Sequence, residues 1–132
     1  MSKLLLVFLG GGFGAGLRYF VAGSEWLRLD NGFPLGTLSV NLIGCFLIGV
    51  LWHLALEPNS FVKPLLIIGL LGGFTTFSSF GLESFQLYEQ GKTNIMVLYI
   101  LLSNIVGLLL VFLGYKLGTI IEINGSNNSI GI

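Results

Sequence analysis

Residues 72–80 read Gly-Gly-Phe-Thr-Thr-Phe-Ser-Ser-Phe, and this uncharged stretch decides how the chain is expected to fold. It lies inside an apolar segment, 64–88, that otherwise has the character of a transmembrane helix. A glycine pair weakens a helix, and hydroxyl side chains can bond to carbonyl groups that a break releases. Irregular backbone at membrane depth persists only where protein buries it or where it lines a polar cavity. The stretch therefore predicts a third span that is broken near the middle of the bilayer.

The composition of the whole chain also indicates a membrane protein. Of its 132 residues, 54% are hydrophobic and 9% are charged, and the mean hydropathy is +0.92. A soluble domain is nearer to about a quarter charged. Six Lys and Arg balance six Asp and Glu, so no basic surface favours nucleic acid. Cys45 and His53 are the single cysteine and the single histidine, which argues against a disulfide or a histidine-based metal site within one chain.

Four apolar segments are each long enough for a membrane helix, which takes about 20 residues. They predict spans at about residues 4–22, 33–56, 64–88 and 95–117, within one all-α transmembrane domain over residues 1–123. The segment 124–132, NGSNNSIGI, is polar and glycine-bearing, and we expect a frayed tail there.

The glycine-rich first span allows more than one interpretation. The opening MSKLLLVFLGGG resembles a signal peptide, but the later spans need a membrane in any case. Gly10, Gly12 and Ala15 mimic a dinucleotide-binding fingerprint, yet no alternation of strands and helices follows. The pairs Gly10/Gly14 and Gly12/Gly16 fit better as small residues that let membrane helices approach closely.

The loop charges give no preferred orientation in the membrane. With four spans, one side carries Lys3, Lys63 and Lys116 and the other carries Arg18, Arg28 and Lys92. Positive charges normally mark the cytoplasmic side, so an even count allows insertion in both directions and antiparallel pairing. The alternative is that a count this small carries no orientation signal.

Uncharged polar and aromatic side chains within the spans indicate the handling of a small anion. The edge of a phenyl ring is electropositive, and hydroxyl and amide groups are neutral donors. Such donors can admit an anion and still release it. The candidates are Phe77, Phe80, Asn41, Ser78, Ser79, Thr37, Tyr99 and Ser103. Asn41 could instead join two helices, and Ser103 could bond back to its own helix.

Two charged residues lie at or near span ends. Arg18 is in the first span, where it can extend to the lipid interface or take a vestibule or structural role. Glu83 follows Phe80 by one turn and is either a residue of a pore mouth or a plain interfacial carboxylate.

These residues resemble those of the small bacterial fluoride channels of the Fluc (CrcB) family. The resemblance covers nearly the whole chain and rests on GAGLRY (14–19), GTLSVNLIGCFLIG (36–49) and, above all, GGFTTFSSFGLE (72–83). It implies a fluoride-selective channel, not an enzyme, in the bacterial inner membrane. It also implies an antiparallel, dual-topology homodimer embedded in lipid, with two pores through which fluoride leaves passively.

The resemblance implies roles for particular residues. Phe77 and Phe80 would line the pores, Asn41 would be the pore asparagine, and Thr37, Tyr99 and Ser103 would form a polar track, with Ser78 and Ser79 between the rings. A structural sodium ion would be held at the dimer centre by the main-chain carbonyls of Gly72 and Thr75. The alternative is a dual-topology exporter of the small multidrug type, which needs a carboxylate that the first span lacks.

Overall fold

The computed structural model describes residues 2–52, 55 and 61–130, and nearly all of them are helical. The elements in order are α1 (Lys3–Ala22), η1 (Glu25–Leu27), α2 (Leu35–Leu51), η3 (Lys63–Leu71), α3 (Gly72–Phe74), α4 (Phe77–Glu89), α5 (Thr93–Leu101), η4 (Leu102–Val106) and α6 (Gly107–Ile130). The segment η1 is a short 3-10 helix, whereas η3 and η4 are π-helical. The prediction of an all-α protein is confirmed for the described residues.

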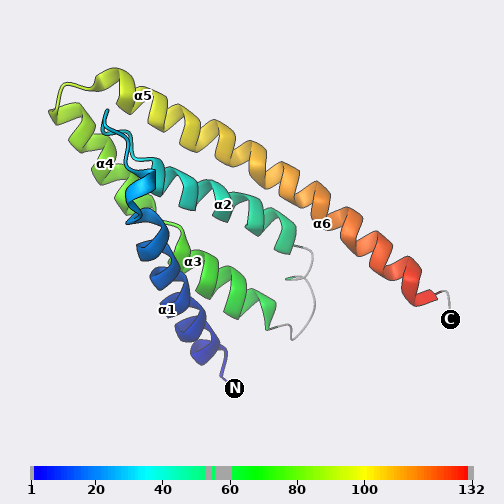
Figure 1. The fold of residues 1–132 in the computed structure, drawn as a ribbon. Coiled ribbons are helices and arrows are strands. Elements are labelled where there is room, and N and C mark those ends of the chain that lie inside the picture. The colour runs from blue at the N-terminus through cyan, green and yellow to red at the C-terminus, as the bar shows by residue number, and fades with distance from the viewer. Residues whose placement is uncertain (1, 53–54, 56–60, 131–132) are drawn as a thin grey trace.

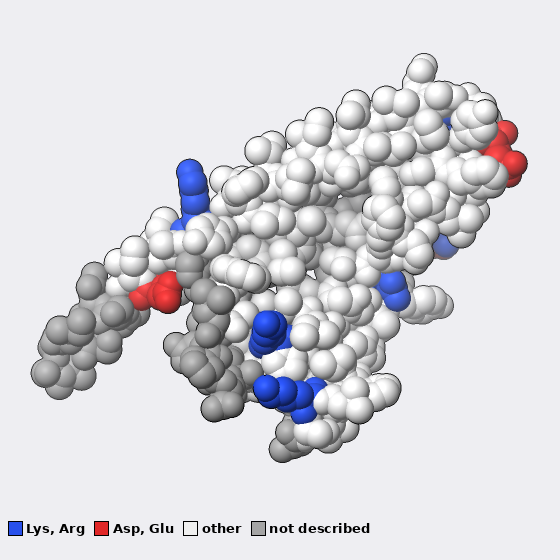
Figure 2. All heavy atoms as spheres, turned by 180° about the vertical axis from the view of Figure 1, so that it is seen from behind, with Lys and Arg blue, Asp and Glu red and all other residues white. Residues whose placement is uncertain are grey.

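Three helical stretches in the described part of the chain are long and apolar enough to cross a membrane: Lys3–Ala22, Lys63–Glu89 and Thr93–Ile123. The helix α2 is apolar as well but has 17 residues. The predicted second span, 33–56, extends beyond the end of α2. Its positions 53 (His53), 54 and 56 lie outside the described residues. Figure 2 shows few charged side chains, in small separate groups, and a long uncharged flank along the upper side of the view. The chain is therefore a multi-pass membrane protein.

The helices pack in two close pairs that lie side by side in Figure 1, α1 along η3 and α3, and α2 along α6. A Cβ added to Gly10 would meet the Leu65 carbonyl oxygen, and one added to Gly14 would meet that of Leu70. The same test on Gly12 finds no atom within 4 Å. Of the two predicted glycine pairs, the Gly10/Gly14 pair thus faces a neighbouring helix within the described chain.

The third span is broken, as the sequence predicts, but at Thr75 and Thr76 and not at the glycine pair. Thr75 has a ψ of 157° and Thr76 a φ of −150°, so both are extended between α3 and α4. Gly73 is part of the helix α3, and its role is in packing. The backbone of α1 lies so close that a Cβ on Gly73 would meet the Gly11 carbonyl oxygen. The break also separates the phenylalanines: Phe74 is 8% exposed and Phe77 is 82% exposed.

The helix α6 continues to Ile130, whereas the sequence predicts a frayed tail over residues 124–132. Serine, asparagine and glycine are weak helix formers, but the segment has no proline, so each residue can extend the preceding turn. The backbone of residues 124–130 is thus helical in the structure, residues 131 and 132 lie outside the described part, and the fraying of this helix end stays a prediction.

Candidate functional site

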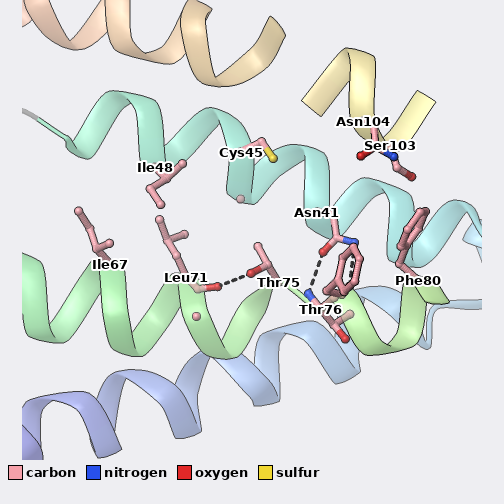
Figure 3. Close-up of a pocket in the computed structure, with 13 residues that line it drawn as sticks. Asn41, Cys45, Ile48, Ile67, Leu71, Thr75, Thr76, Phe80, Ser103 and Asn104 are labelled. Atoms are coloured by element: carbon pink, nitrogen blue, oxygen red, sulfur yellow. Dashed lines mark hydrogen bonds between the residues drawn. The ribbon is translucent and has the colours of Figure 1, made fainter. Parts of the chain in front are cut away.

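A pocket of about 350 Å³ opens beside the break in the third span. Its lining comes from α2 (Asn41, Gly44, Cys45, Ile48), from η3 and α3 (Ile67, Leu71, Gly72), from the break (Thr75, Thr76), from α4 (Phe77, Phe80) and from η4 (Ser103, Asn104). Figure 3 shows how these side chains converge between the two halves of the third span, α2 and η4. The lining contains no charged residue.

Asn41 fixes the broken backbone from the opposite helix. Its Oδ1 accepts from the Thr76 N–H at 2.8 Å, and its Nδ2 donates to the Thr76 carbonyl at 3.0 Å (Figure 3). The side-chain amide thus replaces hydrogen bonds that a continuous helix would have made. Asn41 both joins helices and lines the pocket, so the two interpretations of this residue are compatible.

Thr76 begins α4 as its N-cap, a role that the sequence analysis did not give it. Its Oγ1 accepts from the Ser79 N–H at 3.2 Å and lies 3.0 Å from the Ser79 hydroxyl and 3.3 Å from that of Ser78. Ser78 and Ser79 therefore gather around this cap. A threonine directly before the first residue of a helix was the available signal, because threonine is one of the preferred N-cap residues.

The rings of Phe77 and Phe80 form one end of an aromatic series. Their centroids are 5.5 Å apart with an interplanar angle of 39°. Phe80 also packs on Tyr99, with centroids 5.1 Å apart and an angle of 56°. Because Phe80 touches both rings, it connects the pocket to the fully buried Tyr99 on α5.

The Glu83 carboxylate accepts hydrogen bonds from hydroxyl groups on two other helices, α2 and α5. Its Oε1 accepts from the Thr37 hydroxyl at 2.7 Å, and its Oε2 accepts from the Tyr99 hydroxyl at 2.8 Å. The structure thus brings Glu83 and two predicted track residues together. Each carboxylate oxygen has a donor, which offsets the cost of holding a charge in a partly buried place.

The π-helical turn η4 places consecutive residues, Ser103 and Asn104, in the same pocket. The Ser103 Oγ is buried and has no hydrogen-bond partner among the described residues. Asn104, which the sequence analysis did not single out, donates through Nδ2 to the Ile100 carbonyl at 2.7 Å. Wide helical turns of this kind recur at functional sites, and the free Ser103 hydroxyl is a donor available to a ligand.

The break removes the usual helical donors from carbonyl groups at the end of α3, including those of Gly72 and Thr75. In a continuous helix the Gly72 carbonyl would accept from the Thr76 N–H, and the Thr75 carbonyl from the Ser79 N–H. Those donors are engaged by Asn41 Oδ1 and by Thr76 Oγ1 instead. Arg18, on α1, is half-buried and does not line the pocket.

Residues 5–115 match the family described as CrcB-like protein, Camphor Resistance (CrcB). A protein of Azobacteroides pseudotrichonymphae is 48% identical over 120 residues, which cover 89% of this chain and 96% of that protein.

Two further relatives agree. One of Phocaeicola vulgatus is 46% identical over 116 residues (86% and 96% of the two chains), and one of Aquifex aeolicus is 42% identical over 123 residues (89% and 98%). All three are named fluoride-specific ion channel FluC. Because these relatives are ion channels and not enzymes, the prediction that the chain is not an enzyme is confirmed. The match over residues 5–115 and these identities show that the chain belongs to the CrcB family.

Proposed function

We propose that the chain is a fluoride-selective channel that lets cytoplasmic fluoride leave a bacterial cell passively. The observation that carries the proposal is the ring pair of Phe77 and Phe80 in an uncharged pocket that also holds the Asn41 amide and the Ser103 hydroxyl. The names of the relatives point to the same ion. The multidrug-type exporter has no comparable support.

The chemistry of the pocket suits a small anion with a costly hydration shell. A full positive charge would hold fluoride too tightly, whereas ring edges and neutral donors hold it weakly. On this account the ion meets the Asn41 and Ser103 donors near the hydroxyls of Ser78 and Ser79, and then passes the edges of Phe77 and Phe80 toward Tyr99 and Thr37. The contact between Phe80 and Tyr99 supports this order.

The two charged residues act around the path in this account. Glu83 orients the hydroxyls of Thr37 and Tyr99, since both donate to its carboxylate. Arg18 supplies positive potential at a vestibule, where it raises the local concentration of anions. Neither charge lines the pocket itself.

Hydrogen fluoride explains why a passive pore is enough. The neutral acid crosses membranes and ionises in a less acidic cytoplasm, which traps the anion. An inside-negative potential across the inner membrane then drives fluoride outward through any open path. No energy source and no catalytic group is needed.

We further propose an antiparallel homodimer with two pores. The helix α2, extended by its flanking residues, makes the fourth crossing. The Phe77 ring lines the pocket and is 82% exposed in one subunit, so a second copy would cover it. The cation count of three on each side supports opposite orientations of the two copies. Two-fold symmetry then generates each path twice.

A sodium ion between the two breaks would give the freed carbonyls a partner. Hard cations prefer oxygen ligands, and the Gly72 and Thr75 carbonyls have lost their helical donors to side chains. Two subunits would supply four such oxygens. When bound, sodium supplies a fixed positive charge between two anion paths and joins the subunits. Among the described residues, no group of His, Cys, Asp and Glu could hold a metal.

The test of the proposed function is ion efflux from liposomes that contain the purified protein. Fluoride efflux should be rapid, and chloride efflux should match that from empty liposomes. Equal fluoride efflux with and without the protein would contradict the proposal, as would comparable efflux of both halides.

A further inference from the structure

The link between α1 and α2 is tightly bonded around Phe33. The Gly32 N–H donates to the Leu29 carbonyl at 2.9 Å, with Gly32 at a φ of 82°, a turn that glycine adopts without strain. The Phe33 N–H donates to Asn31 Oδ1 at 2.9 Å, and the Phe33 carbonyl accepts from the Leu35 N–H at 2.8 Å. Because bonds hold the backbone on both sides of Phe33, its side chain leaves the link in a fixed direction.

That direction brings the Phe33 ring onto Tyr99. The two ring centroids are 5.7 Å apart and the planes meet at 76°, an edge-to-face contact. Phe80 packs against the same Tyr99 ring at 5.1 Å. Phe33 also contacts the small core cluster of Leu38, Leu87 and Tyr99. The Tyr99 ring, with no exposed surface, is therefore held by one ring from α4 and one from the link.

The hydroxyl group at the end of the Tyr99 side chain makes a hydrogen bond beside the proposed fluoride path. The hydroxyl donates to Glu83 Oε2 at 2.8 Å. A ring held by two other rings keeps its hydroxyl in one place, whereas a gap in place of Phe33 would let it tilt toward the link. Such a tilt would lengthen or break the contact with Glu83.

We propose that Phe33 is a positioning residue for the Tyr99 hydroxyl, so that the α1–α2 link forms part of the conduction machinery. Of the residues assigned to the proposed path, Tyr99 is the one that Phe33 contacts in the description above. Phe33 therefore acts on the path through the Tyr99 side chain. The expected effect on fluoride flux rests on the proposed function. The effect on the position of Tyr99 does not.

The first test therefore measures position and not flux. With 3-fluorotyrosine placed only at position 99, fluorine NMR of the purified protein should show two separate signals, one for each flip orientation of a slowly flipping ring. Phe33→Ala should let the ring flip faster and merge the two signals, Phe33→Trp should keep them separate, and Trp26→Ala should leave them unchanged. Trp26 is the matched control because it lies in the same link and is 87% exposed. Two signals that stay separate in Phe33→Ala would overturn the proposal, whereas a shift alone reports only the lost ring.

The second test measures fluoride efflux in a double-mutant cycle. Phe33→Ala should lower efflux by about tenfold, the scale of one lost hydrogen bond to a charged group. In a Tyr99→Phe background, which keeps the ring and lacks the hydroxyl, Phe33→Ala should cause no further fall. An equal fall in both backgrounds would overturn the proposal. Phe33→Leu repeats both tests if the alanine variant does not assemble.

The two measurements separate the two possible failures. If the wild-type protein conducts no fluoride, the proposed function fails, and the NMR spectra still decide whether Phe33 positions Tyr99. If the wild-type protein conducts fluoride and the two signals stay separate in Phe33→Ala, only the role of Phe33 is wrong.

Discussion

Asn41 and Thr76, 35 residues apart in the sequence, are joined twice, because one side-chain amide bonds both the N–H and the carbonyl of Thr76. The two bonds imitate the pairing of neighbouring strands, in which a backbone offers a donor and an acceptor together. They allow an extended, 7% exposed residue to persist in the middle of a membrane helix. The break in the third span is therefore stabilised by α2 and does not arise from local weakness alone.

The first prediction concerns this double contact. Asn41→Leu should lower the free energy of unfolding by about 2–4 kcal/mol, because the N–H and carbonyl of Thr76 would stay buried without partners. Asn104→Leu is the matched control, since its amide bonds only the Ile100 carbonyl on its own helix. It should cost less than about 1 kcal/mol. Denaturant unfolding in detergent measures both, and equal losses would contradict the role given to Asn41.

The sequence was sufficient to predict the broken span, because a glycine pair that weakens a helix stands next to four hydroxyl side chains that can bond to the groups a break releases. It did not locate the break, because the position depends on contacts that are remote in the chain. Gly73 remains helical because the backbone of Gly11 lies against it, and Thr76 is extended because Asn41 holds it. The sequence did not predict that α6 continues to Ile130 for a related reason, since weak helix formers still extend an existing helix.

Some residues of the candidate site could likewise be predicted from the sequence, and others could not. Phe77, Phe80, Asn41 and Ser103 were predicted together as residues that handle a small anion, and the structure places all four around one pocket. The contact between Thr37 and Glu83 joins residues 46 positions apart, and no local pattern marks it. Thr76 had a local signal, because threonine is a preferred N-cap and stands directly before the helical segment Phe77–Glu89. Phe33 had none, because a phenylalanine in a link is ordinary until the ring that it touches is known.

The second prediction concerns the packing of α1. Gly14→Ala should lower stability by more than about 2 kcal/mol, because its Cβ would meet the Leu70 carbonyl oxygen and force two backbones apart. Gly12→Ala is the matched control, with no atom within 4 Å of its Cβ, and alanine favours the helix. Thermal unfolding of both variants checks this. A loss for Gly12→Ala as large as that for Gly14→Ala would contradict the packing described here.

The third prediction concerns the proposed sodium ion. After full exchange of sodium for a large organic cation, the dimer should dissociate more readily and fluoride efflux should fall. Gly72→Leu should have the same effect and should remove the protection by sodium. Within one subunit a Cβ at Gly72 meets nothing closer than the Ile67 carbonyl oxygen at 3.8 Å, so dimer stability is the readout that separates a loss of sodium from a side chain that fills the pocket.

Thr75→Val is the control for the third prediction. The Thr75 hydroxyl already donates to the Leu71 carbonyl at 2.9 Å, so replacing it leaves the main-chain carbonyl available to an ion. Size-exclusion chromatography in sodium and in the organic cation reports dimer stability. If the dimer is equally stable in sodium and in the organic cation, the proposed sodium site is wrong.

The fourth prediction concerns orientation. In a variant with Cys45 replaced by alanine and a cysteine added after residue 132, one part of the population should react with an impermeant thiol reagent in intact cells. The remainder should react only after the membrane is opened. Complete labelling or complete protection in intact cells would mean a single orientation and would rule out an antiparallel dimer.

The central claim is that fluoride passes the rings of Phe77 and Phe80, and the most direct measurement is fluoride efflux from liposomes holding Phe77→Ile or Phe80→Ile. Both variants keep apolar bulk and lose an electropositive ring edge. We expect efflux to fall by about tenfold or more in each, with the dimer still assembled. Phe112→Ile, a 67% exposed position on α6, should conduct as the wild type does. Wild-type efflux in both Phe77→Ile and Phe80→Ile would contradict the account.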